Sequence, residues 1–488
     1  MCNSSAAIDA RAWAELAEHL RQDQIQTDAA SRAAFESDGL LAYRQRPVGV
    51  VFPDSSDDVV SILRWCHRHG IPMVARGSGT GLSGGSMPHA DGIVVALNRL
   101  NHVLDIDPVS RTARVQCGVV NAAVSDAARP YGLMYAPDPS SGSVCTIGGN
   151  VAFNSGGAHC LKNGMTAGHV IGMSVVLGDG TVATLGSESL ESVLPDSSGF
   201  FCGNEGLFGI ATEITLRLVP LPETFHTVLV GYDTIRQAGE AVADIIASGL
   251  LPGAMEIMDP TSIKAAEAAV ACGYPSEAHA VLIVELEGAR ERVDHEITIL
   301  HRVLEGTDPS VIQVAADDAE RLSIWKGRKS VFSAAGRLSP DFLVQDGVVP
   351  RCRLGEALEM IETMSHATGI PVANVFHAGD GNLHPLIMYD GSIEGGFEAA
   401  DALAGRILEL CIEMGGSITG EHGVGVEKTH HLEAMFDRDT LDLMKRVRRC
   451  LDPKEICNPG KVFPSDQPAT LTTSGLHPLE KAGVIFRD

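Results

Sequence analysis

Two histidines in the C-terminal half of the chain have the spacing of a metal clamp. His377 and His384 flank Asp380-Gly381, the dipeptide that best suits a two-residue hairpin turn because both central residues need positive φ. This turn would place His377 directly opposite His384 on one face of the hairpin, with β-carbons roughly 4.5–5.5 Å apart. Two imidazoles held in that way can bind one metal ion, so we predict a metal site on this hairpin.

A glutamate and a third histidine further along the chain complete the set. Glu421 offers a carboxylate as a third ligand, and a His₂Glu set suits a catalytic metal that keeps open coordination positions. The adjacent His422 would serve as a base, although a role as a fourth ligand stays open. The alternative interpretation is that these residues lie on unrelated surfaces.

The composition describes a large globular protein with an ample core. A length of 488 residues corresponds to about two or three domains, and 44% of the residues are hydrophobic while 20% are charged. The net charge of −25 argues against a nucleic-acid surface and against electrostatic docking on anionic lipid. No apolar run approaches the about 18–20 residues of a membrane span, and no signal peptide is evident. We therefore expect a cytoplasmic protein.

The cysteines are scattered along the chain and predict no cluster. None of the eleven forms a CxxC pair, so neither a zinc ribbon nor iron–sulfur ligation is supported. We expect buried free thiols. A redox enzyme without its own cluster would have to pass its electrons elsewhere.

The first half of the chain is expected to contain a β-α-β unit and a hairpin. Helix caps, glycine stops and short β-branched runs mark the boundaries of these elements. The predicted elements are a helix at 9–25, a strand at 48–52, a helix capped at 56–58 and stopped by Gly70, a strand at 71–75, a hairpin at 175–182 with Asp179-Gly180 at its tip, and a strand at 211–219.

A pair of prolines, Pro220 and Pro222, is the best candidate for a domain boundary. Helical and strand patterns alternate beyond it, which predicts a second α+β domain with helices at 234–249, 290–305 and 396–414 and strands at 281–286 and 371–377. We expect four parts along the chain: an N-terminal helical segment (1–45), a first domain (46–221), a second domain (222–464) whose last segment returns to the first, and an irregular tail (465–488).

Three segments rich in small residues in the first half suit the close approach of one extended ligand. They lie at residues 76–85, 137–157 and 206–210. The first contains a GxGxxG pattern, but Pro88 and Gly92 leave no room for a helix before the next strand, so the nicotinamide fingerprint is not met. What remains is a loop of backbone N–H groups that can cradle a phosphate. The alternative is three tight loops in a glycine-rich sheet protein.

The two halves together resemble the FAD-linked oxidases, the group typified by vanillyl-alcohol oxidase and p-cresol methylhydroxylase. The chain is most similar to the branch that oxidises D-2-hydroxy acids, and within it to the flavin-bearing D subunits of bacterial glycolate oxidases. The resemblance covers roughly residues 10–464, with Asn163 as a departure from the tyrosine that the family commonly has. The segments that carry it are HAGDGNLH at 377–384, GEHG at 420–423, and those at 159–162, 324–329, 337–341, 346–351 and 451–461.

The resemblance implies an α+β fold with a PCMH-type FAD-binding domain of two subdomains. An α+β substrate (cap) domain of the FAD-linked oxidase C-terminal type would follow it. The implied activity is FAD-dependent oxidation of a small 2-hydroxy acid, glycolate to glyoxylate and also D-lactate to pyruvate, with a hydride passing to FAD and electrons onward to a partner or quinone. A stand-alone D-lactate dehydrogenase is the nearest alternative. A metal-dependent hydrolase is a remote one, because it leaves the first half of the chain without a purpose.

The resemblance also assigns roles to individual residues. The metal on His377, His384 and Glu421 would be zinc, with manganese or iron as alternatives. His422 would remove the substrate hydroxyl proton, and Arg328 would bind the substrate carboxylate unless it forms a surface ion pair. No histidine lies in the phosphate loop, so FAD is expected to be non-covalent. The residues expected around FAD are Arg76, Gly77, Ser78, Gly79, Thr80, Gly81, Pro137, Ser143, Thr146, Gly149, Asn154, Gly156, Ile210 and Asn458.

The resemblance finally implies partners and a substrate class. An iron–sulfur subunit and a second FAD-domain subunit would receive the electrons, and through them the protein would lie at the inner face of the plasma membrane. Leu386 and the neighbourhood of Val344 take the places where relatives with dicarboxylate substrates carry polar side chains. We therefore expect a small monocarboxylate as substrate, because a distal carboxylate would lose its hydration there with no partner.

Overall fold

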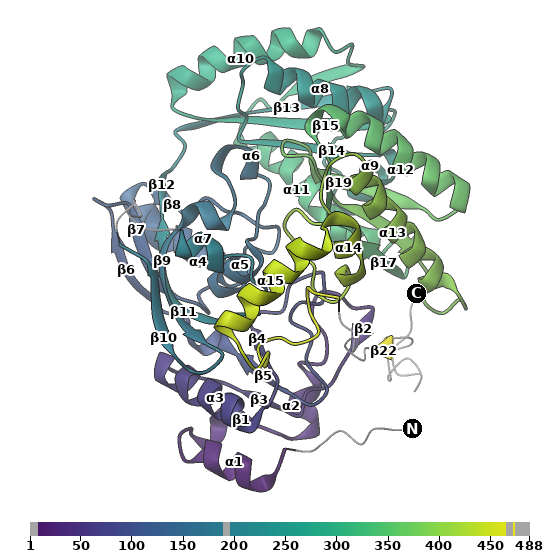
Figure 1. Ribbon diagram of the computed structural model, residues 1–488. Helices are drawn as coiled ribbons and strands as arrows, with labels where there is room; N and C mark the ends of the chain where they lie inside the picture. Colours follow the sequence, from purple (N-terminus) through teal and green to yellow (C-terminus); the bar gives the residue numbers. More distant parts are fainter. Residues whose placement is uncertain (1–7, 189–195, 465–471, 474–488) are drawn as a thin grey trace. The chain divides into compact units, whose positions relative to one another are not determined.

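The chain folds into two compact units in the computed structural model, which describes residues 8–188, 196–464 and 472–473 (Figure 1). The first unit contains, among the described residues, 8–156, those within Gly164–Pro220, and 421–464 with 472–473. The second unit contains Gly157–Asn163 and Leu221–Gly420. The predicted tail at 465–488 lies outside the described residues, apart from a two-residue strand at Thr472–Thr473.

A four-stranded sheet forms the start of the first unit. Its elements are α1 (Ala10–Ala17), β1 (Ile25–Gln26), α2 (Ala29–Ala33), β2 (Tyr43–Arg44), β3 (Gly49–Val51), α3 (Ser56–His69), β4 (Met73–Arg76) and β5 (Ile93–Ala96). The strand order is β1-β3-β5-β4, with β3 and β4 both parallel to β5. Helix α3 begins after Ser55, whose hydroxyl accepts the Asp58 N–H, and ends at Gly70, where φ is +62°. The predicted β-α-β unit is confirmed.

The helix expected at residues 9–25 is shorter than predicted. Helix α1 ends at Ala17, and after a single 3₁₀ turn at Gln22–Gln24 the chain enters β1. Strand β1 pairs with β3, so Ile25 lies opposite Val51. Sheet pairing therefore overrides the helical periodicity in this segment.

A five-stranded antiparallel sheet completes the first unit. The remaining elements of the first unit are β6 (Val103–Asp107), β7 (Thr112–Gln116), α4 (Asn121–Ala128), β8 (Leu133–Met134), α5 (Ile147–Phe153), β9 (Val170–Leu177), β10 (Val182–Gly186), α7 (Ser197–Phe201), β11 (Gly209–Arg217), β12 (Val219–Pro220), α14 (Leu432–Met435), α15 (Arg438–Leu451) and β22 (Thr472–Thr473). The strand order is β10-β9-β11-β7-β6. The predicted hairpin is confirmed as β9–β10, with Gly180 at φ +80° in its loop.

One large sheet with helices on it forms the second unit. Its elements are α6 (Cys160–Asn163), β13 (Thr224–Tyr232), α8 (Ile235–Ala247), β14 (Ala254–Met258), α9 (Pro260–Val270), β15 (Ala280–Gly288), α10 (Arg290–Glu305), β16 (Val311–Val314), α11 (Asp318–Ala335), β17 (Asp341–Val344), β18 (Gly347–Val348), α12 (Leu354–Thr368), β19 (Val372–His377), β20 (Asn382–Leu383), β21 (Pro385–Tyr389) and α13 (Gly396–Glu413). The order is β16-β13-β15-β14-β19-β20-β18, while β21 pairs with β17 and β19. Helices α8 and α10 contact β13 and β15, and α9 and α11 contact each other and β19 (Figure 1).

The turn expected at Asp380-Gly381 differs from the prediction. His377 pairs with Asn382 and not with His384, because the turn spans four residues, 378–381. The Gly381 N–H donates to the Ala378 carbonyl at 3.3 Å, and Gly381 takes φ +79° at the end of the turn. A β-carbon at this glycine would lie 2.2 Å from the Val349 carbonyl oxygen, so the close approach of this backbone also requires glycine. The Asp-Gly pair thus correctly predicted the position of the turn but not the number of residues in it.

Candidate active site

The corrected register still brings the two histidines to one face of the hairpin. A shift of one residue would move His384 to the opposite face, but a shift of two keeps it on the same face. The two rings lie 5.1 Å apart between centroids and are nearly perpendicular. Both side chains are buried, with His377 4% and His384 3% exposed. The predicted pairing was wrong, and the predicted proximity of the two imidazoles was correct.

A fully buried glutamate connects His377 to Arg328. Glu256 lies directly opposite His377 on the neighbouring strand β14. Its Oε1 is 2.6 Å from His377 Nδ1, and its Oε2 accepts Arg328 Nε–H at 2.5 Å. Burial would raise the pKa of the Glu256 carboxyl, but the charge of Arg328 and the hydrogen bond with His377 hold that pKa below its usual value. Arg328 is 4% exposed, so the interpretation as a surface ion pair is wrong.

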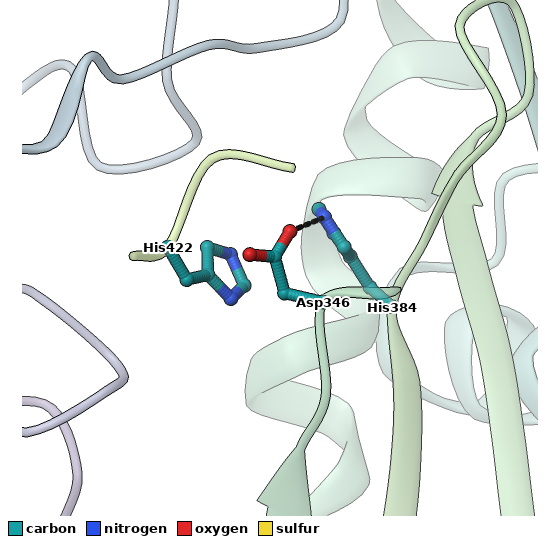
Figure 2. A group of neighbouring side chains, drawn as sticks. All are labelled: Asp346, His384 and His422. Carbon is teal, nitrogen blue, oxygen red and sulfur yellow. Dashed lines mark ion pairs between the residues drawn. The ribbon is translucent and has the colours of Figure 1, made fainter. Parts of the chain in front are cut away.

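A second buried carboxylate, Asp346, lies next to His384. Asp346 Oδ1 is 3.6 Å from His384 Nε2 (Figure 2). The other oxygen, Oδ2, accepts the Thr419 hydroxyl at 2.6 Å and the Gly420 N–H at 3.1 Å. The Asp346 carboxylate therefore lies beside a histidine and fixes the end of the segment that leads to Glu421.

Glu421 and His422 follow Gly420 directly and are counted with the first unit. Glu421 is one peptide bond from Gly420, and consecutive Cα atoms are about 3.8 Å apart. The His422 Nε2 lies 3.7 Å from Glu421 Oε1, and the His422 carbonyl accepts the Ser83 hydroxyl at 2.8 Å. The backbone of His422, the predicted base next to the predicted ligand Glu421, is thus held within the first unit by a residue of the 76–85 loop.

The segment after His422 is fixed by a buried glutamate of the first unit. Glu205 Oε1 accepts the Val424 N–H at 2.6 Å, and Oε2 accepts the Gly425 N–H at 2.8 Å. Burial raises the pKa of the Glu205 carboxyl above its usual value, although these two amides act in the opposite direction. The dipeptide Glu421-His422 therefore has a carboxylate-anchored segment on each side, at Asp346 and at Glu205.

The glutamate face of the second unit extends beyond Glu256; we use this name for Glu256, Glu285 and Glu287. Register places all three on the same face of the sheet, since Glu285 lies opposite Ala254 and Glu256 opposite His377. Glu285 accepts from Trp325 Nε1 at 2.6 Å and from the Thr227 hydroxyl at 2.5 Å. The cations that face these glutamates are Arg321 and Arg328 of α11 and Lys162 of α6.

The three segments rich in small residues come together within the first unit. The Ser78 hydroxyl donates to the Val144 carbonyl at 2.6 Å, so the first segment touches the second. A β-carbon at Gly77 would lie 2.2 Å from Thr146 Oγ1, and Thr146 in turn accepts the Gly149 N–H to cap α5. In agreement with the sequence prediction, no helix follows the 76–85 loop before β5 in this described stretch.

Asn458 joins the residue that precedes the third segment to the first segment. Its side-chain N–H donates to the Gly85 carbonyl at 2.8 Å and to the Glu205 carbonyl at 2.6 Å. Two of the residues expected around FAD have their side chains occupied within the protein. Arg76 donates to the Ser37 carbonyl at 2.7 Å, and Ile210 is 2% exposed within the hydrophobic core.

The remaining expected residues lie along these same loops. Asn154 ends α5 at φ +50°, and its Oδ1 accepts the Ala167 N–H at 2.8 Å. The others fall on the first and second segments: Gly79, Thr80, Gly81, Pro137, Ser143 and Gly156.

Sequence reasoning missed Glu256 and Glu205 and gave Asp346 no role. Glu256 stands alone in the otherwise apolar strand AMEIM, and Glu285 and Glu287 interrupt the apolar run AVLIVELEG. A charged residue in a strand that is buried on both faces needs a partner. That pattern is the signal that could have found the glutamate face.

Two family models match the chain and together span most of it. Residues 47–186 match a model described as an FAD binding domain. Residues 221–462 match a model described as the C-terminal domain of FAD linked oxidases.

Several characterised proteins are similar over nearly the whole chain. The glycolate oxidase subunit GlcD of Escherichia coli K12 is 46% identical over 88% of this chain and 86% of its own length. The GlcD subunit of Bacillus subtilis is 37% identical, over 90% and 93%. The D-lactate dehydrogenase of Archaeoglobus fulgidus is 31% identical, over 85% and 90%.

Solved structures agree in fold. p-Cresol methylhydroxylase with substrate bound aligns with a TM-score of 0.78 at 17% identity, over 93% of this chain and 96% of that chain. The 4-ethylphenol oxidase of Gulosibacter chungangensis aligns with a TM-score of 0.77 at 19% identity, over 94% and 99%. The expected α+β fold with a PCMH-type domain is confirmed.

Proposed function

The chain belongs to the FAD-linked oxidases, and we propose that it oxidises a small 2-hydroxy acid, glycolate first and D-lactate second, with the help of a divalent metal. Its family makes it an FAD-dependent oxidoreductase. The alternative of a metal-dependent hydrolase is set aside, because the FAD binding domain accounts for the first half of the chain. The substrate is inferred from the relatives, which are named for glycolate and D-lactate.

The first unit suits FAD at the place where its small-residue segments meet. The tight approach of Gly77 to Thr146 leaves no room for a side chain at this position of the loop that follows β4. Glycines at such positions let the backbone come close to a pyrophosphate, and loop N–H groups can hold its charge. The residues that would hold FAD are those of the 76–81 loop with Thr146, Gly149 and Asn458. None of the 76–85 residues is a histidine, which supports a non-covalent flavin.

The observation that carries the metal proposal is the pair of buried imidazoles on one sheet face, each beside a buried carboxylate. A histidine that donates from Nδ1 to a carboxylate presents Nε2 to a metal, a pattern common at metal sites. His377 has this arrangement with Glu256. We propose that His377, His384 and Glu421 hold zinc, or manganese or iron in its place. The donor set fits, because two neutral imidazoles and one carboxylate are ordinary ligands for these ions.

The protein side chains then divide the remaining work. A guanidinium has five N–H donors, so the bond from Arg328 Nε to Glu256 leaves donors for a substrate carboxylate. His422 would accept the substrate hydroxyl proton, since its ring lies beside Glu421 and its backbone is fixed by Ser83. When bound, the metal would lower the hydroxyl pKa and FAD would accept the hydride.

The side chains beside the histidines favour a monocarboxylate. Val344 lies directly opposite Leu386, and Leu386 lies opposite Ala373. Alternation along the strands puts both apolar residues on the face that carries His377. Leu386 is fully buried. A distal carboxylate next to these side chains would lose its hydration without a partner, which costs several kcal/mol.

We further propose that electrons leave through partner subunits. The cysteines of the described chain are free thiols rather than members of a disulfide, and no CxxC pair occurs in the sequence. The similar GlcD proteins are named as subunits. An iron–sulfur subunit and a second FAD-domain subunit would serve as the acceptor, and would bring the protein to the inner face of the plasma membrane. Of the helices that the structure describes, none is both long and apolar enough to span a bilayer.

Steady-state kinetics with a dye acceptor test the proposed substrate class. We expect kcat/KM to be highest for glycolate, lower for D-lactate and at least roughly a hundredfold lower for D-2-hydroxyglutarate. The variant Leu386→Asn should shift the ratio toward the diacid, while Leu358→Met, at a buried position of helix α12, serves as a packing control. A wild-type protein that prefers D-2-hydroxyglutarate would contradict the proposal.

A further inference from the structure

The buried carboxylate of Glu256 accepts a hydrogen bond with each of its two oxygens, one from Arg328 and one from His377. It accepts Arg328 Nε–H at 2.5 Å through Oε2 and contacts His377 Nδ1 at 2.6 Å through Oε1. Arg328 can only donate, and a carboxylate can only accept. His377 must therefore carry its hydrogen on Nδ1. In the neutral ring the lone pair then lies on Nε2, the atom that would face a metal.

We infer that Glu256 is a positioning residue that fixes the metal-binding tautomer of His377 and, through the same carboxylate, the orientation of Arg328. This inference rests on the metal site proposed above. It adds that the metal ligand and the carboxylate-binding arginine are not independent, because one fully buried side chain holds both.

The local structure explains why Glu256 can do this. Strands β14 and β19 put Glu256 directly opposite His377, so the two side chains leave the same face of the sheet. On helix α11, Arg321, Trp325 and Arg328 are spaced four and three residues apart and share one side of the helix. Arg321 and Trp325 bind Glu285, and Arg328 binds Glu256. The helix thus presents two donor side chains to Glu285 and one to Glu256.

The variant Glu256→Gln separates this role from simple packing, because glutamine has nearly the same shape. Arg328 donates only, so the glutamine carbonyl oxygen must face Arg328 and its NH₂ group must face His377. Nδ1 of His377 then becomes an acceptor, and the hydrogen of the neutral ring moves to Nε2. An Nε2–H ring cannot bind a metal until that hydrogen is lost or the glutamine turns against the arginine.

The matched control is Glu285→Gln. Glu285 lies on the neighbouring strand of the same face, is equally buried and also binds an arginine of α11, but it contacts Trp325 and Thr227 and not His377. Both variants remove one buried negative charge that pairs with an arginine of α11, so their costs in folding free energy are comparable. Only Glu256→Gln changes the hydrogen bond to a proposed ligand.

The test is the affinity of metal-free protein for Zn²⁺, measured at pH 8 by competition with a chromophoric chelator. We expect Glu256→Gln to weaken Zn²⁺ binding by roughly 10–100-fold, the usual effect of losing a carboxylate behind a ligating histidine. Glu285→Gln should bind Zn²⁺ within about threefold of the wild type. Equal affinity in Glu256→Gln and the wild type would overturn the inference, and so would an equal loss in both variants.

Two further measurements keep the result interpretable. ¹⁵N shifts of the His377 ring in metal-free wild-type protein should report hydrogen on Nδ1; hydrogen on Nε2 would overturn the inference even if Glu256→Gln fails to fold. If His377→Ala binds Zn²⁺ as tightly as the wild type does, the proposed metal site itself is contradicted. The two failures are thus distinguishable.

Discussion

The two units of this protein prepare their sites by different means. In the first unit, the segments expected around FAD meet through backbone contacts, such as the Gly77 backbone against Thr146 and the Ser78 hydroxyl on the Val144 carbonyl. In the second unit, ligand-type side chains are held by other charged side chains, such as His377 and Arg328 on Glu256. The site in the first unit thus depends on glycines that let backbone segments approach closely. The site in the second unit depends on ion pairs and hydrogen bonds between buried charged side chains.

The difference predicts which changes each site tolerates. A backbone loop keeps its N–H groups when neighbouring side chains change, but no glycine at a close approach can be replaced. A buried ionic network fails when one partner is removed, because the remaining charge is left uncompensated. Loss of a side chain in the second unit should therefore have large and specific effects while FAD stays bound.

The largest effect is expected from removing a ligand in the second unit. His377→Ala should lose the metal and slow flavin reduction on the order of 10³–10⁴-fold, because metal activation of the hydroxyl is worth several kcal/mol. FAD content should stay at the wild-type level. Metal analysis, FAD released by acid and stopped-flow reduction measure the three quantities. The exposed His366→Ala in α12 is the control, and loss of FAD from His377→Ala alone would erase the contrast between the units.

His422→Gln should keep both FAD and metal and still reduce flavin roughly 10³-fold more slowly. The reason is that a general base contributes about 10²–10⁴-fold to such a step. His430→Gln changes an exposed histidine of the same unit and should behave as the wild type. Loss of metal from His422→Gln would show instead that His422 is a ligand.

The sequence predicted the backbone half of this picture better than the side-chain half. Glycine patterns, caps and Asp-Gly turns are local, so the β-α-β unit, both hairpins and the absence of a nicotinamide-type helix after the 76–85 loop were accessible from the residues alone. The His377–His384 proximity was also accessible, although the turn is longer than two residues. The partners of the charged groups were not, because Glu256 meets His377 across strands that are far apart in the sequence.

The same limit applies to Glu205 and Asp346. Glu205 binds Val424 and Gly425 more than two hundred positions along the chain, which no periodicity encodes. The residue pattern and the family resemblance indicated the roles of Glu421 and His422, but not the groups that hold these two residues. The length of the first helix was also beyond reach, since its end depends on the pairing of β1 with β3.

Glu205→Gln tests whether the first unit also contains a side-chain anchor that matters. Glutamine keeps one acceptor and turns its NH₂ group toward the other amide, which costs about 1–3 kcal/mol. We expect flavin reduction to fall by roughly tenfold, with Zn²⁺ and FAD retained. Glu213→Gln, a half-buried carboxylate of strand β11 paired with Arg114, is the control. If Glu205→Gln reduces its flavin at the wild-type rate, the contacts of Glu205 with Val424 and Gly425 are not needed for the reaction.

A pH-dependent effect on stability is expected at Lys461, a buried lysine of the first unit. Burial lowers its pKa to about 8, and its ammonium donates to the Met87 carbonyl and to Asn458 Oδ1. Between pH 8 and the ordinary lysine pKa the unfolded chain binds one more proton than the folded one, so stability rises with pH there.

The comparison of wild type with Lys461→Met isolates this contribution. The difference in unfolding free energy should shift in favour of the wild type by at most about 3 kcal/mol between pH 7.5 and 10. Urea unfolding at both pH values measures it, and contributions shared by the two proteins, such as those of the buried thiols, cancel. A difference that is constant with pH would mean that Lys461 does not change its charge in this range.

The most direct test of the central claim is the visible spectrum of the purified protein, with FAD and metal bound, during anaerobic addition of substrate. We predict that glycolate bleaches the flavin absorption, that D-lactate does so more slowly, and that D-2-hydroxyglutarate leaves it unchanged on the same timescale. An oxidised spectrum that persists with both glycolate and D-lactate would contradict the account.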